Sequence, residues 1–398
     1  MADPLNILHT VGFKAMYPMV RAGISLKKPL DARRLTTAVA KVVKAVPQLM
    51  QAYRIKDNEF EDIDAVVGDV LHFVDQIDES AAGKLDWEKQ PQWQLYVTDS
   101  QLVVYGSHIL TDGAGFKQLL YLLCAAYNQT ADLDVANHQD IDGIKALIKK
   151  IPAHQSKNND HPTQALSLPA LAPSPESRQY SILHQHLTAK QFAQLHAWTK
   201  ANGVTINDAV MTAFAKAVQQ FCGVDELNLA CPTDMRQFLP DDQRSELRVQ
   251  NLTGRYNISV AAQPAEDFPA TVVKVHQAMN QQKADYTFLE SFRSMLANLD
   301  DGASVSQLQQ DVENHYHVRS IAYTNMAIVN DARLYFADNE IDDCILTGGF
   351  RTMPHYQICA STFKGQLNLA ANVIATSAEK QLAYAVMSLM RQYLLSVH

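Results

Sequence analysis

Residues 103–116 read VVYGSHILTDGAGF and combine a strand, a turn and a helix in one short stretch. The apolar run at 102–105 is rich in β-branched and aromatic side chains, which is typical of a buried strand. His108 and Asp112, four residues apart, occupy the turn that follows. Beyond Gly113, apolar residues recur at the spacing of one helix face: Phe116, Leu119, Leu120, Leu123 and Tyr127. The pattern therefore predicts His108 at a strand end and Asp112 at a helix start.

The positions of His108 and Asp112 suit a general base at a strand end and a cap at a helix start. Histidine has an unperturbed pKa near 6.5, so at a strand end it can take a proton from a hydroxyl or an amine near neutral pH. The positive end of the following helix favours a neutral His108 and an ionised Asp112, and Gly113 permits a close backbone approach. A short H-x-x-x-D-G pattern also fits a turn whose polar groups bind only one another. The motif alone leaves both interpretations open.

The chain around this stretch has 398 residues, of which 47% are hydrophobic and 19% are charged. At about 100–200 residues per domain, this length predicts two or three domains with ample core. A charged fraction below the usual ~25% argues against long disordered tails. Lysine and arginine number 34 and aspartate and glutamate 42, so the net charge is −8. Because nucleic-acid binders normally carry a basic excess, the composition argues against a nucleic-acid partner.

The cysteines and the N-terminal residues indicate the compartment. The cysteines are odd in number and form no C-x-x-C pair: Cys124, Cys222, Cys231, Cys344 and Cys359. That pattern is typical of reduced thiols in a cytoplasmic protein. The N-terminus lacks the basic and apolar regions of a signal peptide, and the apolar run at 119–127 is far shorter than the ~20 residues that cross a bilayer. We expect a cytoplasmic monomer with no membrane span, no metal site and no tightly bound cofactor.

A composition break divides the chain into two parts of similar size. Five prolines interrupt a polar stretch: Pro152, Pro162, Pro169, Pro173 and Pro175. Because proline fixes φ and removes a backbone donor, neither a helix nor a central strand is expected there. We predict a first lobe over 1–151, a crossover linker over 152–179 and a second lobe over 180–398.

Helix and strand patterns alternate within both predicted lobes. Helical periodicity, with capping residues at several starts, predicts helices near 31–46, 113–127, 188–203 and 381–395, and another that Thr205 or Asn207 can cap and Gly223 ends. Apolar, β-prone runs predict strands near 49–55, 70–74, 92–97, 102–105, 227–231, 256–260, 321–329, 356–363 and 366–373. The mixture predicts an α/β protein, and the absence of a short repeat argues against a solenoid.

Six groups of short motifs follow one another along the chain. They are ISL, PLDARRL and VPQL within 24–49, SHILTDG at 107–113, VTINDAV at 204–210, CPTDMR at 231–236, TN at 324–325 and TFKGQL at 362–367. In this order they resemble the motifs of the chloramphenicol-acetyltransferase-like superfamily, which includes condensation domains, plant BAHD acyltransferases, wax ester synthases and alcohol acetyltransferases. The SHILTDG segment matches its H-x-x-x-D-G active-site motif, and CPTDMR its P-x-D-x-R element.

The resemblance implies an α/β fold of the α+β type. It consists of two chloramphenicol-acetyltransferase-like lobes, each a mixed, largely antiparallel sheet with flanking helices, which meet around a solvent tunnel. His108 would be the general base in this tunnel. Asp112, Gly113 and Arg236 would have structural roles beside it, with Asp112 turned away from the substrate and accepting a bidentate contact from Arg236.

Two further residues are candidates for substrate contact. Thr324 and Asn325 match the Ser/Thr-Asn pair of the family, and either could donate a hydrogen bond to an oxyanion or contact the substrate. A structural role at the end of a strand is the alternative for both.

The function implied by the resemblance is acyl transfer. A coenzyme A thioester would be the co-substrate and acetyl the expected group, an alcohol or an amine the small-molecule acceptor, and an acyl carrier protein an alternative donor. Many relatives carry H-H-x-x-x-D-G, but Ser107 replaces the first histidine here. This departure favours the analogy with stand-alone alcohol acetyltransferases over peptide-forming condensation domains. The alternative function is a catalytically silent scaffold of the same fold that binds a carrier protein or a small ligand.

Other clusters of reactive side chains are weaker candidates. His184 with His186, and His315 with His317, each place two imidazoles on one face, but zinc needs at least a third ligand and none is indicated. We therefore expect solvated or capping roles for these four histidines. None of the cysteines has the flanking signature of a nucleophile, so buried structural thiols are expected.

Overall fold

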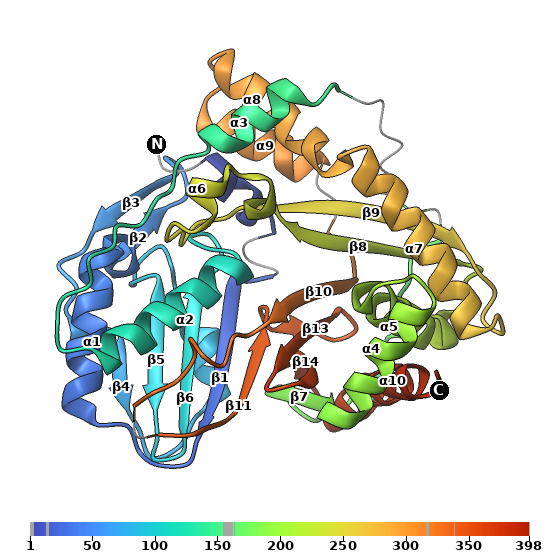
Figure 1. Ribbon diagram of the computed structural model, residues 1–398, viewed down its shortest axis with the longest axis horizontal. Coiled ribbons are helices and arrows are strands. Elements are labelled where there is room, and N and C mark those ends of the chain that lie inside the picture. The colour runs from blue at the N-terminus through green and yellow to red at the C-terminus, as the bar shows by residue number, and fades with distance from the viewer. Residues whose placement is uncertain are drawn as a thin grey trace.

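The computed structural model describes residues 4–12, 16–153, 162, 164–315, 318–337 and 339–397. These residues form two sheet-rich lobes that lie side by side in Figure 1, with mostly blue and cyan elements in one and mostly green, yellow and red elements in the other. Helices pack against the sheets of both lobes. The mixed α/β class and the two-lobe architecture expected from the sequence are confirmed.

A five-stranded sheet in the order β11-β1-β6-β5-β4 forms the first lobe. The neighbours are antiparallel except for β4 and β5. The strands are β1 (Met19–Leu26), β4 (Leu71–Phe73), β5 (Trp93–Val97), β6 (Gln101–Ser107) and β11 (Ile341–Thr347), and a separate hairpin consists of β2 (Gln51–Arg54) and β3 (Glu59–Asp62). Helices α1 (Ala32–Ala45) and α2 (Gly113–Asn128) pack together in the same lobe.

The second lobe has a larger set of strands and helices. Its main sheet has the order β10-β13-β14-β12, with β7 also paired to β14, and β8 and β9 form a long ribbon. The strands are β7 (Gln179–Leu187), β8 (Glu226–Asp234), β9 (Thr253–Ala261), β10 (Ile321–Ile328), β12 (Arg351–Thr352), β13 (Tyr356–Phe363) and β14 (Gln366–Ala375). The helices are α3 (Asp142–Lys150), α4 (Ala189–Ala201), α5 (Ile206–Cys222), α6 (Asp241–Arg244), α7 (Phe268–Ala284), α8 (Glu290–Asp300), α9 (Val305–His315) and α10 (Ser377–Leu395).

The central helix of the second lobe illustrates how local signals fix an element. Thr205 caps α5 by accepting a hydrogen bond from the backbone of Asp208, whose carboxylate binds the Thr205 backbone in return. Every residue from Asp208 to Gln219 is buried, because α5 contacts α7 and α10 as well as β8. Gly223 ends the helix with a φ of 64°, a left-handed conformation that glycine adopts without strain.

The two lobes exchange segments. Strand β11, from the second half of the chain, pairs with β1 along the edge of the first sheet. In the opposite direction, the short N-terminal 3₁₀ helix η1 (Pro4–His9) buries Leu5 and Ile7 in the hydrophobic core of the second lobe. Because each core draws residues from both halves of the chain, the domain limits predicted at 151, 179 and 180 remain a prediction.

Most predicted elements occur close to their predicted positions, and the largest differences are at their ends. The predicted strand at 49–55 begins as a 3₁₀ helix, η2 (Pro47–Met50), because proline favours the first turn of a helix, and only Gln51–Arg54 is extended. The last helix begins at Ser377, before the predicted start, because Thr376 and Glu379 form a capping box there.

Candidate active site

His108 lies at the junction between the two lobes. Strand β6 ends at Ser107 and α2 begins at Gly113, as the sequence predicts. The backbone N–H of His108 donates to the carbonyl of Pro18 at 3.1 Å, and the Asn251 side chain of the second lobe donates to the carbonyl of His108 at 3.0 Å. The backbone of His108 is therefore held from both sides.

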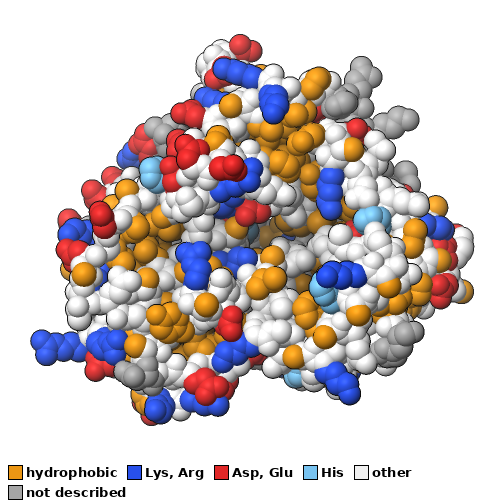
Figure 2. All heavy atoms as spheres, in the orientation of Figure 1, with side chains coloured by type: hydrophobic (Ala, Val, Ile, Leu, Met, Phe, Trp, Pro, Cys, Tyr) orange, Lys and Arg blue, Asp and Glu red, His pale blue; other side chains and the backbone are white. Residues whose placement is uncertain are grey.

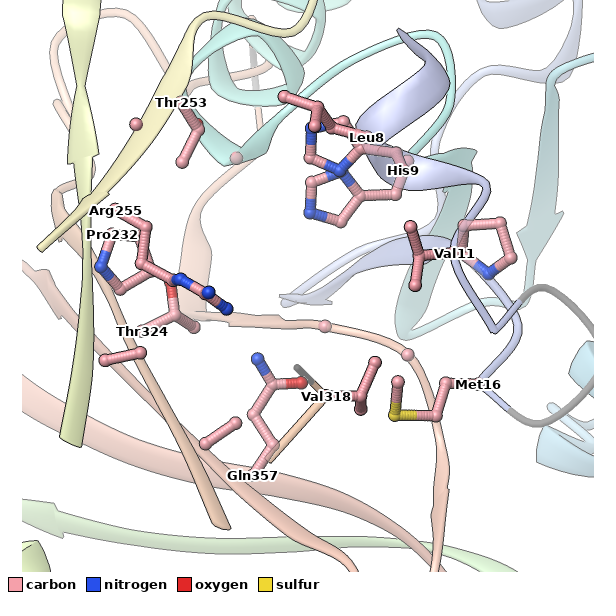
Figure 3. Close-up of a pocket in the computed structure, with 18 of the residues that line it drawn as sticks. Leu8, His9, Val11, Met16, Pro232, Thr253, Arg255, Val318, Thr324 and Gln357 are labelled. Atoms are coloured by element: carbon pink, nitrogen blue, oxygen red, sulfur yellow. The ribbon is translucent and has the colours of Figure 1, made fainter. Parts of the chain in front are cut away.

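A cavity of ≈ 540 Å³ opens beside His108. Figure 2 shows the surface hollowed between the two lobes, and Figure 3 shows side chains facing the cavity from opposite walls. Thr253, Arg255 and Thr324 belong to one wall, while Leu8 and Val11 belong to the other. Further apolar lining comes from α8 and α9 through Phe292, Met295, Leu308 and Val312. The cavity therefore combines apolar lining from α8 and α9 with polar groups from the strands and from the same two helices, among them Asp311 and His315.

The electrostatic environment keeps His108 in its basic form. Burial lowers the pKa of His108 below its usual value, while its own carbonyl, the Asp112 carboxylate and the Asn251 side chain act in the opposite direction. Nδ1 is buried, and within the described part of the chain no hydrogen bond of normal geometry reaches it. At neutral pH the ring is uncharged and can accept a proton.

Asp112 points away from the cavity and is fully engaged. Its Oδ1 caps α2 by accepting from the backbone of Gly115 at 2.8 Å. Its Oδ2 accepts from Nη1 of Arg236 at 2.9 Å, from the backbone of Leu252 at 2.7 Å and from Oγ1 of Thr253 at 2.9 Å. Burial alone would raise the pKa of Asp112, but the Arg236 charge and these hydrogen bonds outweigh it and lower the pKa to about 2. Asp112 therefore stays ionised and is unsuited to proton transfer.

Arg236 joins several segments of the second lobe to this carboxylate. It lies in η5 (Met235–Phe238), and its Nη1 also contacts Asp234 at 3.0 Å. Nη2 donates to the carbonyls of Arg248 and Gln250, at 2.9 and 2.8 Å. Only Nη1 binds Asp112, so the expected bidentate contact is wrong: the second nitrogen is committed to backbone carbonyls. The ion pair itself is present, and it ties the motif of the first lobe to the second lobe.

Two glycines at the start of α2 allow this close packing. A side chain at Gly113 would collide with Met326, which lies across the cavity wall. A Cβ at Gly115 would meet Oγ1 of Thr111, and it would lie 2.8 Å from the carbonyl of Arg248 and 3.0 Å from Nη2 of Arg236. Space therefore requires a glycine at 115, where a Cβ would meet backbone, whereas the flexible end of the Met326 side chain could move away from a Cβ at position 113.

Thr324 and Asn325 both line the cavity from β10. The amide nitrogen of Asn325 donates to Oδ1 of Asn207 at 3.0 Å, and its oxygen accepts from the backbone of Ala327 at 2.8 Å. These contacts favour the structural interpretation for Asn325 and leave Thr324 as the better candidate for contacting a substrate.

A second histidine, for which the sequence carries no motif, also lies in the site. His9, from η1, stacks on His108 with ring centroids 4.5 Å apart and an interplanar angle of 20°. No local motif marks His9, because the contact joins the N-terminal segment to a turn far along the chain.

The other clusters weighed from the sequence do not form a comparable site. The rings of His184 and His186 stack at 5.9 Å, and His184 binds Oδ1 of Asn368 at 3.0 Å. His315 lines the cavity, while His317 lies outside the described residues. Among the described residues, no three His, Cys, Asp or Glu side chains are grouped to hold a metal ion.

Three of the buried cysteine thiols are poor nucleophiles, and Cys222, which was expected to be buried, is partly exposed. Burial raises the pKa of Cys124 to about 12, that of Cys231 to about 11 and that of Cys359 to about 12. Because the thiolate is the reactive form, these side chains are inert near neutral pH.

None of the described helices combines the length and apolar character that a bilayer crossing requires.

No protein-family model matches the chain, and no curated protein matches it in sequence. Solved structures, however, resemble it over its full length. The first condensation domain of the CDA synthetase has a TM-score of 0.69 and 12% identity, and the match covers 100% of this chain and 96% of that one. TRI3 trichothecene 15-O-acetyltransferase from Fusarium sporotrichioides has a TM-score of 0.67 and 12% identity, with 100% and 94% covered.

A third similar structure is polyketide synthase associated protein 5 from Mycobacterium tuberculosis. Its TM-score is 0.66 at 14% identity, and the match covers 100% of this chain and 98% of that one. Likeness at this level of identity concerns the fold. The chain therefore has the chloramphenicol-acetyltransferase-like fold of condensation domains and of the TRI3 acetyltransferase, as the sequence motifs predicted.

Proposed function

We propose that this protein is an acyltransferase in which His108 is the general base. The observation that carries the proposal is the His108 imidazole beside a cavity of ≈ 540 Å³ between two lobes, with the nearby Asp112 carboxylate bound to Arg236. An acyl donor and an acceptor that must both come close to the His108 ring need an open site of this kind. The fold, which the chain shares with an acetyltransferase and with condensation domains, supports the same reaction class.

The proposed reaction is direct transfer of an acyl group from a thioester to an alcohol or an amine. His108 removes the proton of the acceptor, whose oxygen or nitrogen attacks the thioester carbonyl carbon. The resulting tetrahedral oxyanion collapses, the carbon–sulfur bond breaks, and the thiolate takes the proton from the imidazolium. No acyl-enzyme forms and no resident cofactor takes part, so His108 returns to its neutral state after each turnover.

The donor is proposed to be a coenzyme A thioester and the transferred group acetyl. A thioester on an acyl carrier protein is the alternative donor, since condensation domains are among the similar structures. Thr324 on the wall of the cavity is the proposed donor of a hydrogen bond to the oxyanion. We further propose that the enzyme acts as a monomer in the cytoplasm.

Release of free thiol tests the reaction. The purified protein is incubated with acetyl-coenzyme A and longer acyl thioesters, each against a panel of alcohols and amines, and the thiol is followed with a chromogenic disulfide reagent. The expected result is acceptor-dependent release that falls by a factor of ~10²–10⁴ in His108→Ala, the range for loss of a general base. A wild-type rate in His108→Ala would refute the role of His108. Absence of release from every donor would favour the silent scaffold.

A further inference from the structure

His9 and His108 form a stacked pair at the wall of the cavity. Their ring centroids are 4.5 Å apart and their planes are inclined by 20°, so one face of the His108 ring is covered by the His9 ring. Both residues line the cavity, and Figure 3 shows His9 between the backbone of η1 and the open space. The contact fixes the relative orientation of two rings that come from segments far apart in the sequence.

Several contacts hold His9 in this position. Leu5 and Ile7 anchor η1 in the core of the second lobe, and Thr10 closes it with backbone and side-chain hydrogen bonds to the carbonyl of Ile7, at 3.1 and 2.8 Å. Asn251 donates to Asn6 of η1 as well as to the carbonyl of His108. One amide side chain thus links the segments that carry both rings, and the stack is part of a fixed framework.

The environment also sets the charge of His9. Burial, and then the proximity of His108, lower the pKa of His9 well below its usual value, while Asp112 acts in the opposite direction. His9 is therefore neutral when His108 takes up a proton. A neutral aromatic ring can lie against an imidazolium favourably, whereas two charged rings at this distance would repel each other.

Other charged or titratable groups face the site from the elements packed around it. Asp112 is the carboxylate that acts on both imidazoles. The remaining groups along the cavity wall are Tyr17, Lys117 of α2, Asp234 of β8, Arg255 of β9, Asp311 and His315 of α9, Arg319, Tyr323 of β10 and Arg351 of β12. Among the described residues, His9 is the group whose ring stacks on His108.

We propose that His9 is a positioning residue of the active site, whose ring fixes the plane of the His108 imidazole and shields one of its faces from water. The proposal rests on the proposed function of His108. It makes two separate predictions, because orientation governs the rate of proton transfer and shielding governs the pH at which His108 titrates.

Three substitutions separate these effects. His9→Phe keeps a flat ring that does not titrate, His9→Leu keeps an apolar side chain without a flat face, and His9→Ala removes both. We expect His9→Phe to retain kcat within a few-fold, and His9→Leu and His9→Ala to lose about 10-fold or more, because a small misplacement of a reacting group is costly. His196→Ala, which removes an exposed histidine on α4, is the matched control and should leave kcat unchanged.

Titration by NMR of protein labelled at histidine provides a readout that needs no substrate. The His108 resonance is assigned from its loss in His108→Gln. We expect the pKa of His108 to rise in His9→Ala, towards the ordinary value near 6.5, and to stay low in His9→Phe and His9→Leu. An unchanged pKa in His9→Ala would overturn the shielding role, and wild-type kcat in His9→Leu would overturn the orienting role. If no thioester reacts even with the wild type, the proposed function fails, and the titration alone decides whether His9 shields His108.

Discussion

Asp112 of the first lobe and Arg236 of the second form a buried ion pair, with Nη1 2.9 Å from Oδ2 and side-chain exposures of 1% and 7%. The pair lies directly behind the turn that carries His108. Both side chains also form hydrogen bonds to uncharged backbone groups: Asp112 accepts from the backbone of Leu252, and Arg236 donates to the carbonyl of Gln250. The pair is therefore the centre of a network in which each charge is compensated.

The first prediction concerns the coupling within this pair. Removing one partner of a buried ion pair costs about 3–5 kcal/mol, because the remaining charge is stranded. Asp112→Ala and Arg236→Ala should each lower the free energy of unfolding by this order, and the double variant should lose less than the sum, by about 1–3 kcal/mol. Urea denaturation measures all three variants.

An exposed ion pair provides the control for this double-mutant cycle. Lys27 and Glu340 lie 3.0 Å apart with side chains 50% and 59% exposed, so their removal should change stability by no more than about 1 kcal/mol. Additive losses for Asp112 and Arg236 would show that the two side chains act independently and would contradict the network.

The second prediction is a loss of stability in acid. The pKa of Asp112 is lowered to about 2, compared with about 3.9 for an unfolded aspartate. The ionised Asp112 carboxylate therefore adds about 2–3 kcal/mol to the free energy of unfolding above about pH 4, and this contribution is lost as the pH falls towards 2. Unfolding in urea at pH 4.5, 4.0, 3.5 and 3.0 should show a steeper loss for wild type than for Asp112→Asn.

Asp234 shares Arg236 and must be separated from this effect. Burial raises the pKa of Asp234. Ionisation of Asp234 therefore lowers the free energy of unfolding as the pH rises above about 4, whereas ionisation of Asp112 raises it. The Asp234→Asn variant should therefore still lose stability below pH 4, because Asp112 is still protonated there. An identical acid profile in wild type and Asp112→Asn would show that the Asp112 carboxylate does not govern stability in this range.

The sequence predicted the parts of the site that depend on local pattern. The strand end before His108 and the helix start at Asp112 follow from apolar spacing and capping chemistry within one short stretch, and the structure contains both. The ion pair with Arg236 came from the resemblance to a family. Its single-nitrogen geometry could not be predicted, because it depends on two backbone carbonyls that the fold alone brings to Nη2.

The parts that the sequence did not predict are contacts between distant segments. Strand β11 completes the sheet of the first lobe, although the composition break at 152–179 assigns it to the second. The stack of His9 on His108 has the same origin, since η1 is placed by the burial of Leu5 and Ile7 in the other lobe. Periodicity describes which face of an element is buried, and it does not identify the element that covers it.

The third prediction concerns the pH dependence of the proposed acyl transfer. His108 must be unprotonated to act as a base, so kcat/KM should fall as the pH decreases through the pKa of His108 in the free enzyme. Since burial lowers this pKa, the midpoint of the acidic limb should lie below about 6.5. A pH series of thiol release measures it, and a midpoint above 7 would contradict the buried, neutral state of the ring.

The last prediction tests the close packing at the start of α2. Alanine favours a helix over glycine by about 1 kcal/mol, so helix propensity alone would make Gly115→Ala stabilising. A Cβ at Gly115, however, would lie 2.8 Å from the carbonyl of Arg248, which is held by Nη2 of Arg236 and cannot move without disturbing the ion pair. Overpacking of this kind costs about 1–3 kcal/mol.

We therefore expect Gly115→Ala to be destabilising by up to about 2 kcal/mol, because the steric cost exceeds the gain in helix propensity. Gly68, in the short 3₁₀ helix η3 (Val67–Asp69), offers a control: no atom lies within 4 Å of a Cβ built there, so Gly68→Ala should leave stability unchanged or raise it by up to about 1 kcal/mol. Urea denaturation of both variants decides the sign. A more stable Gly115→Ala would mean that the Arg248 carbonyl yields easily, and that the network around Asp112 and Arg236 is less rigid than its contacts indicate.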